Sequence, residues 1–219
     1  MIKGLIFDLD GTLTLTQNLH YQALHRAFAE YGIDYTQEED IEKYAGQGSK
    51  HTCERVLAAA GKNPTPEEIT KCAATKKMYY DEIVANTEIR IVPGLKPFLI
   101  DSLAAGYKMI VATGNKLEAT ETILEKVGIK DFFELIVSQT DVSNQKPAPD
   151  LFLLAAKKMG LEPSECVVFE DALNGVKAAK TGNFKCIGLA TGTTEEKLKE
   201  AGADEAIADY NDEKLKKII

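Results

Sequence analysis

The chain has 219 residues, of which 44% are hydrophobic and 27% are charged, a balance that is ordinary for a globular domain. Its formal net charge of −8 argues against a nucleic acid or an anionic membrane as a partner held by bulk charge. No stretch approaches the 18 consecutive apolar residues of a membrane-spanning helix, so we expect no membrane span.

The first predicted element is a strand at residues 3–8, and two acidic residues and a glycine follow its apolar run. Residues 15–90 contain no convincing strand and predict helices at 18–32, 38–46, 49–61 and 66–84. The turn-forming sequence Val92-Pro93-Gly94 follows them. We therefore predict an all-helical cap domain at residues 15–90, inserted after the first strand into a core made of residues 1–14 and 91–219.

Beyond the insertion, predicted strands alternate with predicted helices. The strands lie at residues 107–113, 133–138, 165–170, 184–190 and 204–209. Between them, residues 117–128 and 149–160 have helical spacing of apolar residues and end at a glycine. Most of the strands are continuously apolar, which is typical of a parallel sheet covered on both faces. The sequence thus predicts an α/β fold with a Rossmann-like parallel sheet core.

Polar residues follow four of these strands at the point where each strand ends. In chain order they are Asp8 and Asp10, then Thr113, Gly114 and Asn115, then Lys146, and finally Glu170 and Asp171. Because ligands bind outside the carboxyl ends of the strands of an open parallel sheet, we expect these side chains to converge on one site.

Asp8 and Asp10 are two residues apart, so both can face one reacting centre if the chain stays extended there. One carboxylate suits a nucleophile and the other a general acid and base. Two like charges near a buried strand repel each other and need an offsetting cation. Mg²⁺ with oxygen ligands is the usual choice. Asp171 is the obvious third ligand. With Lys146, Thr113 and the backbone N–H groups around Gly11 and Gly114, this set suits a phosphoryl group.

Four segments carry a resemblance to a known family. DLDGTLT, VATGN, KPAPD and FEDALNGVKAA resemble, in order, the four motifs of the haloacid dehalogenase superfamily. The helical insertion resembles the cap of its phosphatase and β-phosphoglucomutase branch. The resemblance spans essentially the whole chain, and it implies a core of the haloacid dehalogenase type with a cap inserted after the first strand.

The resemblance also implies roles for individual residues. Asp8 would be the nucleophile that forms an aspartyl-phosphate, and Asp10 would act as acid and then as base. Thr113 and Lys146 would hold the phosphoryl group. Mg²⁺ would be bound by Asp8, by the backbone carbonyl of Asp10 and by Asp171, with Glu170 nearby through water. Asp10 also argues against dehalogenation, because that branch lacks a carboxylate at this position.

Each of these residues also has a simpler interpretation. Lys146 alone would be a solvated loop lysine, and Thr113 a strand-end residue without a role. Glu170 and Asp171 would cap the helix that begins near Ala172, a role that can coexist with metal binding.

Cap residues bear on whether water or a sugar hydroxyl accepts the phosphoryl group. His20 and Lys76, with Tyr80, match a pattern found in the cap of β-phosphoglucomutase. His20 is also explained as a residue beside an apolar helix stripe, and Lys76 as part of a solvated helix face. In the cap loop GQGSKHT, Gln47, Ser49 and Lys50 replace the arginine with which the mutase holds a distal phosphate.

Leu15, Gln17 and Ala172 likewise favour hydrolysis, because they depart from the mutase pattern. The sequence predicts a Mg²⁺-dependent phosphatase of small organic phosphates, with sugar or polyol phosphates as substrates. A β-phosphoglucomutase-like mutase is the alternative. A non-catalytic binding protein on the same fold is a minor alternative, since no catalytic carboxylate is lost.

The remaining expectations concern the state of the chain. Its four cysteines lack C-x-x-C spacing and a histidine cluster, so we expect reduced thiols in the core rather than a zinc site or disulfides. Met1–Lys3 lead directly into the first strand, so we expect no signal peptide and a cytoplasmic location. With no obvious long exposed apolar stripe, we expect a monomer that takes a small-molecule phosphate ester.

Overall fold

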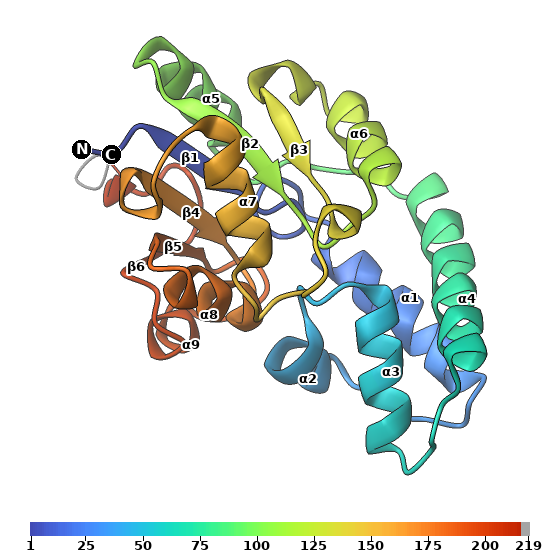
Figure 1. Ribbon diagram of the computed structural model, residues 1–219. Helices are drawn as coiled ribbons and strands as arrows, with labels where there is room; N and C mark the ends of the chain where they lie inside the picture. The colour runs from blue at the N-terminus through green and yellow to red at the C-terminus, as the bar shows by residue number, and fades with distance from the viewer. Residues whose placement is uncertain (216–219) are drawn as a thin grey trace.

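A six-stranded parallel sheet with the strand order β3-β2-β1-β4-β5-β6 forms the centre of the protein (Figure 1). The computed structural model describes residues 1–215. The strands are β1 Gly4–Phe7, β2 Lys108–Ala112, β3 Leu135–Val137, β4 Cys166–Glu170, β5 Lys185–Leu189 and β6 Glu205–Ile207. All six predicted strands are confirmed, and their parallel pairing confirms the predicted α/β class.

Helices cover both faces of this sheet, as the continuously apolar strands predicted. They are α5 Leu95–Ala104, α6 Leu117–Lys126, α7 Asp150–Met159, α8 Leu173–Thr181 and α9 Glu195–Glu200. Side chains alternate along β1: Leu5 and Phe7 pack with α5 and α6, whereas Ile6 packs with α7 and α8 on the opposite face. Because β1 is buried on both faces, its carboxyl end is a rigid platform for the residues that follow it.

The chain between β1 and α5 folds into a group of helices at one end of the sheet (Figure 1). They are α1 Gln17–Ala29, α2 Gln37–Glu39, α3 Ser49–Ala59 and α4 Pro66–Ala85. Phe28, Tyr35, Tyr44 and Leu57 belong to a separate apolar cluster that holds them together. Thr65 and Glu68 form a reciprocal capping box at the start of α4.

One predicted helix differs in the structure. Residues 38–46 form the end of α2 and a π-helical turn, Asp40–Tyr44, instead of a regular α-helix. In this wider turn the Ala45 N–H donates to the carbonyl oxygen of Asp40 at 2.7 Å. The turn directs the following loop, residues 45–48, toward the strand ends.

The two connections between the inserted helices and the sheet run side by side. The Leu15 N–H donates to the carbonyl oxygen of Arg90 at 2.8 Å, and the Val92 N–H donates to that of Leu13 at 3.0 Å. Thr14 and Ile91 form an isolated antiparallel bridge between the two segments. This short pair of linkers is where the insertion leaves and rejoins the sheet.

All four cysteines are buried free thiols, as predicted, and the thiol of Cys72 contacts that of Cys53 inside the helical insertion. Within residues 1–215, no helix combines the length and the apolar character needed to cross a lipid bilayer.

Candidate active site

Asp8 follows β1 directly and is held by a buried lysine. Lys146 Nζ donates to Asp8 Oδ1 at 2.6 Å and to Glu170 Oε1 at 2.5 Å, and the side chain of Lys146 is fully buried. Glu170 ends the neighbouring strand β4, and its other carboxylate oxygen accepts from the Ala172 N–H at 2.6 Å. The lysine thus fixes the Asp8 carboxylate in place.

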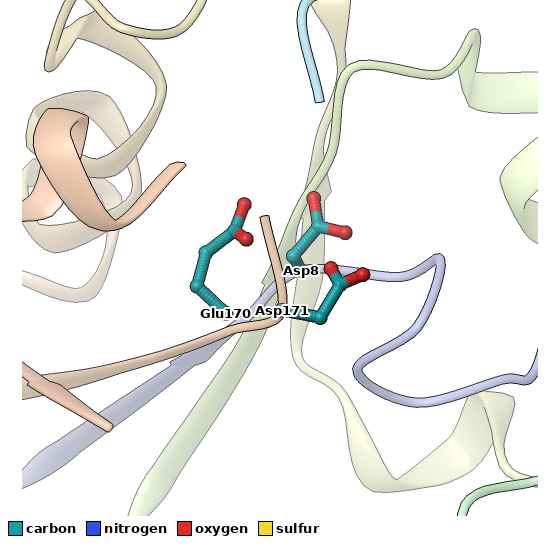
Figure 2. A group of neighbouring side chains, drawn as sticks. All are labelled: Asp8, Glu170 and Asp171. Atoms are coloured by element: carbon teal, nitrogen blue, oxygen red, sulfur yellow. The ribbon is translucent and has the colours of Figure 1, made fainter. Parts of the chain in front are cut away.

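Three carboxylates meet at the ends of β1 and β4. Asp8, Glu170 and Asp171 each offer an oxygen, and these atoms lie within 4.8 Å of one another (Figure 2). All three side chains are buried, so their mutual repulsion is poorly screened by water. Carboxylate oxygens are the ligands that Mg²⁺ prefers, so this donor set fits the expected cation.

The pKa values of Asp8 and Asp171 are both raised, first by burial and then by the neighbouring carboxylates. Burial, together with the charges of Glu170 and Asp10, raises the pKa of Asp8 to about 7, although Lys146 lowers it. Burial, together with Glu170 and Asp8, raises the pKa of Asp171 well above its ordinary value. A divalent cation bound among these groups would favour their ionised forms.

Asp10 points away from the acidic cluster toward the helical insertion. Its Oδ2 accepts from Asn115 Nδ2 at 2.6 Å, and its Oδ1 accepts from the Thr16 hydroxyl. His20 Nε2 lies 3.0 Å from Asp10 Oδ1, so this ring nitrogen faces the carboxylate. Although burial opposes ionisation, His20, Thr16 and Asn115 together lower the pKa of Asp10 to about 2.

His20 links Asp10 to Lys76. Lys76 Nζ lies 2.7 Å from His20 Nδ1, and both side chains contact the ring of Tyr80 on α4. Burial lowers the pKa of His20 and also lowers that of Lys76, to about 8. At pH 7 Lys76 is therefore the charged member that donates to Nδ1, which leaves the imidazole proton on the nitrogen facing Asp10.

A small cavity lies between the strand ends and the inserted helices. Its lining includes Asp8, Asp10 and Asp171 from the core, and the space open to the centres of water molecules is about 50 Å³. Thr113 and Asn115 line it from the end of β2, and the Asn115 N–H donates to Thr113 Oγ1 at 3.1 Å.

The loop at residues 45–48 closes the cavity over the strand ends. A Cβ on Gly114 would approach the carbonyl oxygen of Gly46 to 3.3 Å, so the two backbones are nearly in contact. Asn174 Nδ2, on α8, donates to the carbonyl oxygens of Ala45 at 3.1 Å and of Lys43 at 3.3 Å. These backbone contacts keep the loop against the core.

Most of the residues predicted for substrate binding line this cavity: Gly114, Asn115, His20, Gln47, Ser49 and Lys76. The amide of Gln47 is already occupied, because its Nε2 donates to the carbonyl of Lys43 and its Oε1 accepts from Arg55.

The structure does not bring two other predicted residues into the cavity. Lys50 lines a wider groove of about 910 Å³ outside it. Gly11 is absent from the lining, and its own N–H donates to the carbonyl oxygen of Thr14 at 2.6 Å. Instead, Gly11 leaves space that Asp171 fills, since a Cβ there would collide with that carboxylate.

Sequence reasoning missed three buried polar residues that line the cavity or support it. Thr16 bonds to Asp10, and Asp40 and Thr52 line the side of the cavity formed by the inserted helices. No signal in the sequence pointed to Asp40, because Lys43 three residues later makes an ordinary surface ion pair the simpler interpretation.

Asp40 carries a testable dependence of stability on pH. Burial raises its pKa from 3.8 to about 6, although its bond from Tyr35 and the charge of Lys76 oppose the shift. Between these two pH values the folded state retains a proton that the unfolded state has lost. Wild-type protein should therefore lose stability relative to Asp40→Asn as pH rises through this window, by about 3 kcal/mol in all.

Urea unfolding of both proteins between pH 4 and pH 7.5 measures this difference. Asp34→Asn, at an exposed carboxylate of the same helical insertion, is the matched control and should give a curve parallel to wild type. A wild-type curve parallel to that of Asp40→Asn would contradict the predicted shift.

Comparisons with known proteins agree with this geometry. Residues 5–189 match the family model described as "Haloacid dehalogenase-like hydrolase". The chain is similar to Protein CbbY of Cereibacter sphaeroides, with 30% identity over 96% of this chain and 93% of that protein. It is also similar to fructose-1-phosphate phosphatase YqaB of Escherichia coli (strain K12), with 30% identity over 84% of this chain and 94% of that protein.

Among solved structures, a crystal structure of β-phosphoglucomutase from Clostridium difficile matches 100% of this chain and 96% of its own, with a TM-score of 0.88 and 29% identity. The shared architecture includes the parallel sheet and the helices inserted after its first strand. With a family model matched over most of its length, the chain belongs to the haloacid dehalogenase-like hydrolases.

Proposed function

We propose that the protein is a Mg²⁺-dependent phosphatase that hydrolyses small sugar or polyol phosphate monoesters through an aspartyl-phosphate. The observation that carries this proposal is the placement of Asp8. It is held by Lys146 at 2.6 Å, belongs to the cluster of three carboxylates, and shares one cavity with Asp10.

In the first half of the reaction, a carboxylate oxygen of Asp8 attacks the phosphorus atom. A bond forms between this oxygen and phosphorus, and the bond from phosphorus to the ester oxygen breaks. The departing alcohol takes a proton from Asp10. An ester bound as its monoanion brings that proton, and the phosphoryl charge beside Asp10 raises its pKa so that it can carry the proton.

In the second half, water attacks the phosphorus atom of the aspartyl-phosphate. Asp10, now a carboxylate, accepts a proton from this water, and the bond between phosphorus and Asp8 breaks to release inorganic phosphate. The Thr113 hydroxyl and Lys146 donate to the phosphoryl oxygens in both halves. His20 and Asn115 hold Asp10 in its position toward the cavity.

The metal site in this proposal uses the three clustered carboxylates. Asp8 and Asp171 would bind Mg²⁺ directly with the backbone carbonyl of Asp10, and Glu170 would act through water. When bound, the cation offsets the charge of the attacking carboxylate and of the phosphoryl group.

We also propose that residues 15–90 act as a cap over a core made of residues 1–14 and 91–219. The paired linkers at Leu15 and Val92 and the backbone seal at Gly46 support this division. A closed cap excludes bulk water while Asp8 attacks the ester.

A mutase of the β-phosphoglucomutase type is the second candidate function. It is favoured by the position of His20 and Lys76 next to Asp10 and by the likeness to β-phosphoglucomutase from Clostridium difficile. Against it, none of the described residues that line the cavity is an arginine, the side chain that grips a second phosphate best.

A panel of phosphate esters assayed with and without Mg²⁺ tests the proposal. We expect release of inorganic phosphate from sugar and polyol phosphates, and loss of that activity when the metal is chelated. Incubation with β-glucose 1-phosphate and a trace of the bisphosphate separates the two candidates. Glucose 6-phosphate as the product would support the mutase, and free phosphate would support the phosphatase.

A further inference from the structure

Asp40 occupies an unusual position for a carboxylate that has no catalytic role. It begins the π-helical turn Asp40–Tyr44, and its N–H donates to the carbonyl oxygen of Thr36 at 3.0 Å. Its side chain is only 3% exposed, yet it lines the same cavity as Asp8 and Asp10. The turn therefore holds a buried carboxylate against the space where the alcohol part of a substrate would lie.

The hydrogen bonds of this carboxylate are incomplete. Asp40 Oδ1 accepts from the Tyr35 hydroxyl at 2.6 Å, and no other hydrogen bond to the carboxylate occurs within residues 1–215. A carboxylate has about four acceptor positions. Asp40 Oδ2 accepts no hydrogen bond from the described residues and is not fully buried, so it can accept one from a group in the cavity.

The charges around the cavity decide what kind of donor fits. Asp8, Asp10, Asp40 and Asp171 line it, whereas Lys76 is the one lysine or arginine among its described lining residues. Asp8 and Asp171 belong to the metal cluster at the core end, so Asp40 faces the alcohol part of the ester. A second anionic group on a ligand would meet this carboxylate, while a hydroxyl group would donate to it.

The pKa of Asp40, about 6, leaves the group ionised at pH 7 in spite of its burial. Thr52, which is 3% exposed, adds a hydroxyl on the same wall of the cavity. An acceptor and a hydroxyl that line the same cavity match the hydroxyl groups of a polyol.

We propose that Asp40 is a specificity-determining residue, which accepts a hydrogen bond from a hydroxyl group of the substrate alcohol and disfavours esters whose alcohol carries a carboxylate. This inference rests on the proposed phosphatase function and narrows its substrate class to uncharged polyol and sugar phosphates. The selection acts at the alcohol end of the ester and leaves the phosphoryl chemistry unchanged.

Glycerol 3-phosphate and 3-phosphoglycerate form a matched pair of probes, because they share a three-carbon skeleton and differ by a hydroxymethyl group against a carboxylate. We expect wild-type kcat/KM to favour glycerol 3-phosphate. Asp40→Asn, which keeps an acceptor for Tyr35, should reduce this preference at least about ten-fold by improving 3-phosphoglycerate hydrolysis. Asp40→Ala should reduce the preference for glycerol 3-phosphate as well. Agreement between the two variants would exclude an effect of the amide introduced by Asn.

Tyr35→Phe is the matched control, because it removes the same hydrogen bond from a residue that does not line the cavity. It should lower stability and, when assayed at pH 8.5 so that Asp40 stays ionised without the bond that lowers its pKa, leave the substrate preference unchanged. The proposal is overturned if wild type prefers 3-phosphoglycerate, or if both Asp40 variants retain the wild-type preference.

A binding measurement separates this proposal from the proposed function. Calorimetric titration of the two esters into Mg²⁺-loaded Asp8→Asn protein, with and without Asp40→Asn, reports the preference without turnover. A shift in the ratio of Kd values between the two proteins supports the role of Asp40. If wild type hydrolyses no ester, that result refutes only the phosphatase activity. An unchanged ratio in a protein that hydrolyses esters refutes only the role of Asp40.

Discussion

Asp8→Asn is expected to lower turnover of every phosphate ester by at least about 10⁴-fold, because the amide cannot form the aspartyl-phosphate. The fold should survive, since Lys146 keeps Glu170 as a partner at 2.5 Å. Steady-state phosphate release measures the loss. In wild type, borohydride reduction of the trapped acyl phosphate should convert residue 8 to homoserine, which mass spectrometry identifies.

An unchanged circular dichroism spectrum and melting temperature for Asp8→Asn would show that the loss is chemical. Activity close to that of wild type, or a label on a residue other than Asp8, would contradict the nucleophile assignment and with it the proposed reaction.

Asp10→Ala is expected to slow both formation and breakdown of the aspartyl-phosphate, each by ~10²–10⁴-fold, because the same carboxyl group gives and then takes a proton. Rapid-quench single-turnover experiments with a labelled ester measure the two steps separately. Asp10→Asn is the matched variant, because an amide of the same size can still accept from Asn115.

The leaving group provides the control for Asp10. A nitrophenyl ester departs without a proton, so Asp10→Ala should form the intermediate from it at nearly the wild-type rate and still hydrolyse it slowly. Equal losses for the formation step with nitrophenyl and alkyl esters would contradict the role of Asp10 as an acid.

The sequence was most informative where burial imposes a strong pattern. Most strands of the sheet are continuously apolar because both faces are covered, and all six strands were predicted within a few residues. The helix α5 received no specific prediction. Pro97 lies within it, a residue that breaks helices except in the first turn, where it occurs here.

The core half of the candidate site was foreseen because parallel strands deliver their ends to one edge, and so Asp8, Lys146, Glu170 and Asp171 come together as expected. The cap half was foreseen less well. The hydrogen bond between Gln47 and Arg55 depends on tertiary packing, and so does the burial of Asp40. Neither feature could be predicted from the spacing of residues in the sequence.

The loop that seals the cavity is fastened through its main chain, since Asn174 binds the carbonyl oxygens of Lys43 and Ala45. Carbonyl oxygens persist whatever side chains surround them. A library randomised at positions 49 and 50, which begin α3 directly after the loop, should therefore alter substrate choice while the loop stays against the core. Natural substitutions of these side chains could likewise change substrate choice without breaking the carbonyl contacts of the loop.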